Sequence, residues 1–264
     1  MGCNMLGLEW APVAGVIVGF IVGLTGVGGG ALMAPILLVG FGVDLMTVVA
    51  TDLLFATLTK LAASSVHSRN ALVDWEVTRR MWLGSIPLSL IVIAAVYSGL
   101  AIENEELVKN LLGLLILMSA ISLLFGRKLQ FMQRAKRIAT PAKFKRFQVP
   151  MTTASGALLG GLVALTSVGA GALGAVMLRT LYPLRMTPQK LVATDTVHAI
   201  PVALIAGITY LALGFVDTTL LTYLLAGSIP AALVGSKIMG NLRPEVVKGL
   251  LAIALLTAGF KLIY

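Results

Sequence analysis

Long apolar segments occupy almost the whole of this 264-residue chain, and only short polar stretches separate them. The apolar class makes up 58% of the residues and charged residues only 12%, whereas a soluble domain is about 45–50% apolar and about 25% charged. This composition excludes a water-soluble globule and predicts an all-α polytopic membrane protein. We expect one membrane domain, because the length accommodates roughly six to eight spans of about 20 residues each.

Six of the segments have the length of ordinary transmembrane helices. A span of about 20 residues crosses a hydrocarbon core of ~30 Å at ~1.5 Å per residue. The predicted spans are 47–66, 80–99, 107–125, 190–213, 218–236 and 246–263.

Two further segments, 12–40 and 150–182, are longer, and a cluster of small residues interrupts each of them in the middle. The interruption reads LTGVGGGAL at 24–32 and LTSVGAGAL at 165–173. Glycines in a helix interior cost about 1 kcal/mol each relative to alanine. We therefore expect a broken helix in each segment, with neither arm long enough to cross the bilayer by itself.

The two interruptions mark an internal duplication. They differ at only two positions, where Gly26 and Gly29 correspond to Ser167 and Ala170. Two tetrapeptides also recur in the same order and at nearly the same spacing: VATD at 49–52 and 192–195, and GSIP at 84–87 and 227–230. The chain thus divides into a first repeat (1–125), a basic linker (126–149) and a second repeat (150–264).

The distribution of Lys and Arg indicates how the broken segments lie in the membrane. Cytoplasmic loops carry an excess of these residues, and the stretch 127–146 is strongly basic. If both broken segments are re-entrant hairpins, each repeat crosses three times, the second repeat is inverted, and only Lys109 and Lys261 fall outside. If both segments cross fully, several more basic residues of the second repeat fall outside. The count favours two inverted-topology repeats, each with one re-entrant broken-helix hairpin and three transmembrane helices.

The interruptions also carry chemistry that points to a ligand. Irregular backbone inside a membrane survives only where it is buried or lines a cavity, and the first N–H groups of a helix lack partners and favour an anion. The sequence therefore predicts an anion site without metal or cofactor. Its candidate substrate-binding residues are Thr25, Gly26, Val27, Gly28, Gly29, Gly30, Thr166, Ser167, Val168, Gly169, Ala170 and Gly171. The alternative is that the glycines only allow close helix packing.

Asp52 and Asp195 lie at matched positions within apolar spans. An intramembrane carboxylate is energetically expensive and is a functional candidate by default. Each Asp either carries a proton during transport or accepts hydrogen bonds from the hairpin N–H groups and holds the tip in place. For the preceding residues, Thr51 and Thr194, proton coupling and a structural role are likewise both open.

Two further ionisable side chains lie in the same spans. Lys60 either pairs with Asp52 or attracts the anion, or else it snorkels to an interface. His198 follows Asp195 by one helical turn on the same face, so a proton relay and a simple buried hydrogen bond are both open.

The duplicated LTGVGGGAL and LTSVGAGAL segments, the paired ATD triplets and the length resemble those of the TauE/SafE family of sulfite exporters. The resemblance covers nearly the whole chain. It implies a bacterial or archaeal plasma-membrane transporter for sulfite, thiosulfate or an organosulfonate such as sulfoacetate. Ser167 and Ala170 replace glycines of the full motif, so the two half-sites are expected to differ.

The prediction is a secondary transporter, not an enzyme, that moves a small sulfur oxyanion by alternating access. The hairpin tips hold the anion, and Asp52 and Asp195 are available for proton coupling. The expected partners are the anion, membrane lipids and protons, without nucleic acid and with a homodimer left open. The expected location is the plasma (inner) membrane, with 126–149 in the cytoplasm.

An anion channel with the same site is the main alternative function. A membrane-embedded enzyme is disfavoured, because His67 and His198 are the only histidines and no nucleophile–base pair accompanies them. Cys3 is the single cysteine, which excludes a disulfide framework and a cysteine-based metal cluster.

Overall fold

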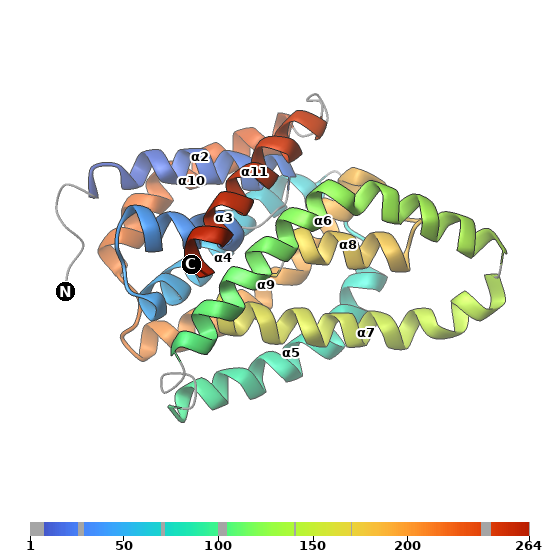
Figure 1. The fold of residues 1–264 in the computed structure, drawn as a ribbon, viewed down its shortest axis with the longest axis horizontal. Helices are drawn as coiled ribbons and strands as arrows, with labels where there is room; N and C mark the ends of the chain where they lie inside the picture. The colour runs from blue at the N-terminus through green and yellow to red at the C-terminus, as the bar shows by residue number, and fades with distance from the viewer. Residues whose placement is uncertain are drawn as a thin grey trace.

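The computed structural model describes residues 8–25, 29–69, 72–99, 105–139, 141–169, 171–238 and 244–263. Within these residues the chain is a bundle of helices without a strand, as its composition predicts (Figure 1). The helices are α2 (Ala11–Thr25), α3 (Gly29–Pro35), the π-helical turn η1 (Ile36–Gly40), α4 (Leu45–Arg69), α5 (Trp75–Tyr97), α6 (Glu105–Ala139), α7 (Pro141–Thr166), α8 (Ala172–Leu181), α9 (Pro188–Ala212), α10 (Thr218–Ile238) and α11 (Pro244–Ile263).

Six helices contain a stretch that is long and apolar enough to cross a membrane, which confirms a multi-pass membrane protein. These stretches are Leu45–Ser65, Trp75–Tyr97, Glu106–Phe125, Phe147–Thr166, Pro188–Ala212 and Thr218–Ile238. The stretches in α4, α5, α6, α9 and α10 correspond to predicted spans. The stretch in α7 does not, and the predicted span 246–263 forms α11, whose described apolar part is the shorter Ala252–Lys261.

Both predicted interruptions fall between two described helices, and residues 26–28 of the first lie outside the described part of the chain. α2 ends at Thr25 and α3 begins at Gly29, while α7 ends at Thr166 and α8 begins at Ala172. The prediction of two short arms is wrong for α7, which has 26 residues. The apolar pattern begins near Pro150, but the preceding basic residues also form helix. A helix does not need apolar residues along its whole length, so hydropathy does not mark where α7 begins.

The second break has an irregular backbone. Gly169 and Gly171 adopt φ values of 131° and 109°, and Ser167 adopts 58°. Positive φ is strained for residues with a side chain but not for glycine. The two glycines therefore fit the turn that separates α7 from α8.

The helices of the two repeats pack in corresponding pairs. α2 packs along α10 as α7 packs along α5, and α6 packs against α11. Matched glycines line the first two seams: Gly15 on Leu224, Gly19 on Ser228, Gly156 on Met81 and Gly160 on Ser85. A side chain at any of these glycines would overlap the neighbouring helix, so close packing of small residues explains these positions. In these two seams the residue numbers rise together along both partners, which makes α2 parallel to α10 and α5 parallel to α7.

The equivalent helices α4 and α9 pack against each other. Thr51, near the start of α4, accepts a hydrogen bond from the backbone N–H of Asp217, which follows α9 (3.1 Å). Thr194, near the start of α9, accepts one from the backbone N–H of Asp74, which follows α4 (3.0 Å). The two helices therefore run antiparallel, and each end of the pair is tied to the other repeat.

α6 and α7 extend together beyond the rest of the bundle, and their ends form one extremity of the molecule (Figure 1). α6 has 35 residues, which is about 50 Å at 1.5 Å per residue and exceeds a hydrocarbon core of ~30 Å. The segment between the two sequence repeats is thus mostly helical.

Candidate functional site

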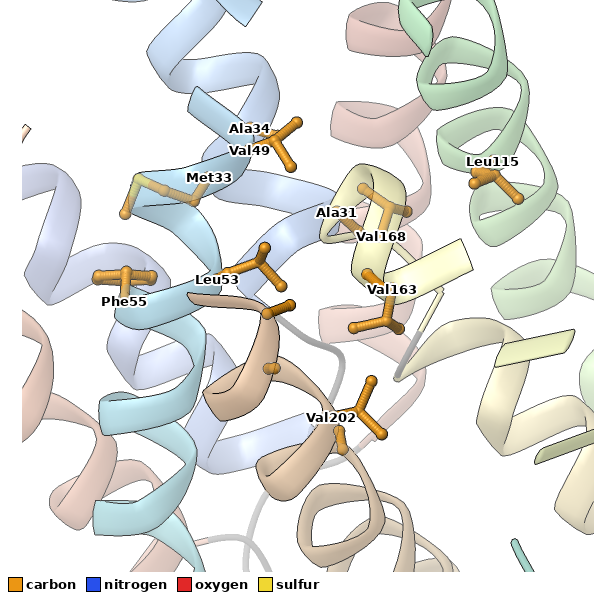
Figure 2. Close-up of a cluster of buried hydrophobic side chains, with 14 of the residues drawn as sticks. Ala31, Met33, Ala34, Val49, Leu53, Phe55, Leu115, Val163, Val168 and Val202 are labelled. Atoms are coloured by element: carbon orange, nitrogen blue, oxygen red, sulfur yellow. The ribbon is translucent and has the colours of Figure 1, made fainter. Parts of the chain in front are cut away.

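The two breaks are in contact. A Cβ on Gly30 would overlap the carbonyl oxygen of Ser167, so only glycine permits this approach. Figure 2 shows the neighbouring residues Ala31 and Val168 close together among buried apolar side chains. The fold therefore joins the two segments that the sequence singles out.

Asp52 on α4 lies beside this contact. A Cβ on Gly30 would come within 3.0 Å of its Oδ2 atom. The residue is fully buried, and neither carboxylate oxygen has a hydrogen-bond partner among the described residues. Ser167 contributes a polar side chain next to Asp52, but its hydroxyl does not reach hydrogen-bond geometry either. The site thus contains acceptor and donor groups that remain unsatisfied.

Asp195 on α9 occupies the corresponding place at the second break. A Cβ on Gly174 would overlap its Oδ1 atom, and the backbone amide of Gly171 faces the carboxylate. In the described part of the chain, neither oxygen completes a hydrogen bond. Each buried carboxylate therefore lies against the backbone of one broken segment.

Lys60 supplies positive charge to both carboxylates. Its side chain is only 3% exposed. It interacts electrostatically with Asp195 and, less strongly, with Asp52. Of the Lys and Arg residues whose side chains are described, Lys60 is the buried one. Because Lys60 is buried inside the bundle, its side chain does not snorkel to a membrane interface, and that alternative is wrong.

His198 makes the simple buried hydrogen bond that the sequence leaves open. Its Nε2 atom lies 3.1 Å from the hydroxyl of Ser85, and its carbonyl accepts the indole N–H of Trp82 (3.0 Å). Nδ1 has no partner among the described residues. In the other repeat, Ser228 corresponds to Ser85 and bonds the hydroxyl of Thr59 (2.9 Å).

The predicted tip hydroxyls are turned toward their own helices. Thr25 donates to the carbonyl of Ile21 (2.8 Å) and Thr166 to that of Leu162 (2.7 Å). The backbone N–H of Val168 donates to Thr166 (3.2 Å). The remaining predicted tip residues Gly26, Val27, Gly28 and Ala170 lie outside the described residues.

The sequence does not indicate Gly174, Ser85 or Trp82 as site residues. Gly174 corresponds to Met33 in the first repeat, so the duplication gives no signal there. Ser85 belongs to the recurring GSIP tetrapeptide, so the duplication could have indicated a buried hydroxyl in each repeat, at Ser85 and at Ser228.

A pocket of about 460 Å³ opens between α4, α5 and α9. It is lined by Leu61, Ser64, Trp75, Trp82, Ile86, Val197, Ile200 and Pro201. Leu61 follows Lys60 in the chain and Val197 precedes His198. The pocket therefore borders the helix segments that carry the buried ionisable groups.

Ion pairs join the two repeats at the end of the bundle where α5 begins. Arg185 binds Asp74 (2.7 Å between Nη2 and Oδ1) and Glu76 (2.7 Å), and Lys190 lies 3.4 Å from Asp74. Partial burial acts to lower the pKa of the Arg185 guanidinium, but bonds and charge from the two carboxylates raise it. The charged loop before α9 is thus fixed to the start of α5.

Comparison with known proteins settles the family. A family model described as "Sulfite exporter TauE/SafE" matches residues 11–262. The chain belongs to the TauE/SafE family. This TauE/SafE protein is 34% identical over 252 residues to "Probable membrane transporter protein YjnA" of Bacillus subtilis (strain 168), covering 94% of this chain and 97% of that protein. It is 26% identical over 233 residues to "Probable membrane transporter protein YdhB" of the same organism, covering 88% and 89%.

No solved structure matches the TauE/SafE protein described here. The family and the two relatives make it a membrane transporter rather than an enzyme.

Proposed function

We propose that this TauE/SafE protein is a secondary transporter that moves a small sulfur-containing oxyanion across the plasma membrane by alternating access. Sulfite, thiosulfate and organosulfonates such as sulfoacetate are the candidates. One observation carries the proposal: two broken helices meet, and each lies against a buried carboxylate whose oxygens lack hydrogen-bond partners among the described residues. The family's description as sulfite exporters supports the substrate class.

The anion binds, in this proposal, where the Asp carboxylates now lie. A sulfur oxyanion and a carboxylate are both acceptors that seek N–H donors. Asp195 lies against the start of α8, a helix of 10 residues, and helix N-termini favour anions. Asp195 therefore takes the place of the anion while the site is empty.

Protons enter the cycle because like charges repel. An ionised Asp52 or Asp195 beside the anion would oppose binding in a buried site. Protonation of a carboxylate removes this repulsion and frees the backbone donors that it faces. Anion and proton consequently bind together.

Alternating access requires two related states of the site. We propose that residues 1–125 and 150–264 are repeats of opposite orientation, with re-entrant breaks and with 126–149 on the cytoplasmic side. The antiparallel pair α4–α9 and the exchanged bonds at Thr51 and Thr194 support this arrangement. The pocket that Ser64, Trp75 and Val197 help to line is a candidate access path from the end that carries Arg185.

Flux measurements in proteoliposomes test the proposed function. The expected result is saturable uptake of a labelled sulfur oxyanion, with counterflow when the same unlabelled anion is placed on the other side. Absence of flux for sulfite, thiosulfate and sulfoacetate alike would overturn the proposal. A conductance that neither saturates nor shows counterflow would identify a channel.

A further inference from the structure

Four ionisable side chains are buried together on the antiparallel helices α4 and α9: Asp52, Lys60, Asp195 and His198. Lys60 interacts electrostatically with the other three. The two carboxylates occupy matched repeat positions, but Lys60 has no counterpart, because Ala203 stands at its place in the second repeat. The matched positions thus carry two negative charges, and among the described side chains Lys60 is the one buried positive charge for both.

No other described side chain that packs near this cluster alters its charge. Tyr210 on α9 is buried but donates its hydroxyl to the carbonyl of Ala164 (2.8 Å). On the neighbouring helices, Lys237 is exposed near the end of α10 and Arg179 lies in the last turn of α8. The first turns of α5 carry Glu76, Arg79 and Arg80, of which Arg79 is exposed and Glu76 and Arg80 pair with each other. α2, α3 and η1 carry no ionisable side chain.

His198 does not add a second cation. Its Nε2 atom shares a hydrogen bond with Ser85, and a positive charge on the ring would face that of Lys60 in a buried site, where like charges repel strongly. The backbone dipoles at the breaks orient an anion but carry no net charge. The net charge of the site is therefore set by Lys60 and by the protons on Asp52 and Asp195.

These groups allow three charge states. With both carboxylates ionised the cluster carries −1, with one protonated it is neutral, and with both protonated it carries +1. A net charge left unbalanced among buried apolar side chains is strongly unfavourable. The neutral empty site holds one proton, and a neutral loaded site holds two protons and one monovalent anion. A divalent anion remains unbalanced even in the most positive state.

This inference rests on the proposed function and narrows its substrate class. We propose that the cluster balances a single negative charge, so that the protein carries monovalent sulfur oxyanions, such as hydrogen sulfite, in preference to divalent ones, such as thiosulfate and the dianion of sulfoacetate. One proton is taken up with each anion. Lys60 then acts as the specificity-determining residue, because its ammonium group is the charge that the anion neutralises.

Paired probes that differ by one charge test this inference. Methyl sulfate and S-methyl thiosulfate keep the shape of sulfate and thiosulfate, with a methyl group in place of one charge. Calorimetry on the purified full chain at neutral pH should give at least tenfold tighter binding for each monovalent member. Equal or tighter binding of the divalent members would overturn the inference and leave the proposed function standing. Binding of none of the four probes would also overturn the inference, whereas the proposed function is overturned only if sulfite, thiosulfate and sulfoacetate all lack flux.

Variants of Lys60 provide a second readout. Lys60→Arg keeps the charge and should keep the preference for the methyl esters. Lys60→Met should abolish binding of the methyl esters. The double variant Lys60→Met/Asp195→Asn should also abolish it. Because the double variant removes one charge of each sign, it leaves no unpaired buried charge and should fold. The matched control is Lys261→Met, at an exposed lysine of α11. Binding of methyl sulfate by the double variant with wild-type affinity would contradict a role for Lys60.

Discussion

The backbone N–H of Asp74 donates a hydrogen bond of 3.0 Å to the hydroxyl of Thr194, and this bond joins the first repeat to the second. The exchanged bond, from Asp217 to Thr51, has nearly the same length of 3.1 Å. Thr194 in turn donates to the carbonyl of Lys190 (2.7 Å). The recurring ATD triplet therefore pairs an Asp that faces the site with a Thr that fastens the two repeats to each other.

Replacing Thr194 tests this structural role. Thr194→Val keeps the shape but leaves the buried N–H of Asp74 without an acceptor, which costs about 1–3 kcal/mol. We expect a lower unfolding temperature in detergent, and a similar loss for Thr51→Val. Thr222→Val is the control, because this threonine is exposed and bonds only within its own helix. Unchanged stability of both core variants would show that the exchanged bonds do not fasten the repeats.

Transport should depend on the glycines that face the carboxylates. A methyl group on Gly174 would overlap Asp195, and one on Gly30 would overlap the backbone of Ser167. We expect Gly174→Ala and Gly30→Ala to lower flux at least tenfold in protein that still inserts and purifies as wild type. Gly40→Ala is the control, because no atom lies within 4 Å of its added Cβ. Normal flux in both site variants would remove the breaks from the mechanism.

The pH dependence of anion binding follows from protonation of the buried carboxylates. A lower pH favours the protonated form, which no longer repels the anion, so affinity for methyl sulfate should rise as pH falls. The variant Asp52→Asn/Asp195→Asn has no carboxylate left to titrate in the cluster, and its affinity should vary less with pH. A pH profile identical to that of the wild type would assign Asp52 and Asp195 a structural role only.

The sequence predicts the chemistry-bearing positions better than the helix boundaries. The breaks, Asp52, Asp195 and the repeat are visible because small residues and carboxylates are rare within apolar segments. The start of α7 at Pro141 is not visible, because hydropathy marks where lipid begins and not where a helix begins. Contacts such as that of Gly174 with Asp195 depend on packing between distant segments, which no local pattern encodes.

The ion pairs before α9 should contribute to stability. Arg185→Gln would leave the negative charge of Asp74, whose side chain is 2% exposed, paired with Lys190 at the longer distance of 3.4 Å. Removing one partner of a fully buried pair costs about 3–5 kcal/mol. The loss here should be smaller, about 1–3 kcal/mol, because the Arg185 side chain is 41% exposed. Thermal unfolding measures it, with Arg79→Gln at an exposed position as the control, and equal unfolding temperatures would contradict a stabilising role.

The proposed orientation of the repeats places Asp44 and Asp217 on the same side of the membrane. Single cysteines introduced at these positions in a Cys3→Ser background should both react with an impermeant maleimide added to intact cells. A cysteine at Arg185 should react only after the membrane is opened. Labelling of Asp44→Cys and Asp217→Cys from opposite sides would reject the inverted hairpin arrangement.

We propose that an anion and a proton bind together where the two breaks meet the buried carboxylates. Proteoliposomes that contain a pH-sensitive dye test it most directly, when a gradient of methyl sulfate is imposed without a proton gradient. We predict that protons move in the same direction as the anion, one for each, and that this movement is lost in Lys60→Met/Asp195→Asn. Anion flux that leaves the internal pH unchanged would contradict the claim.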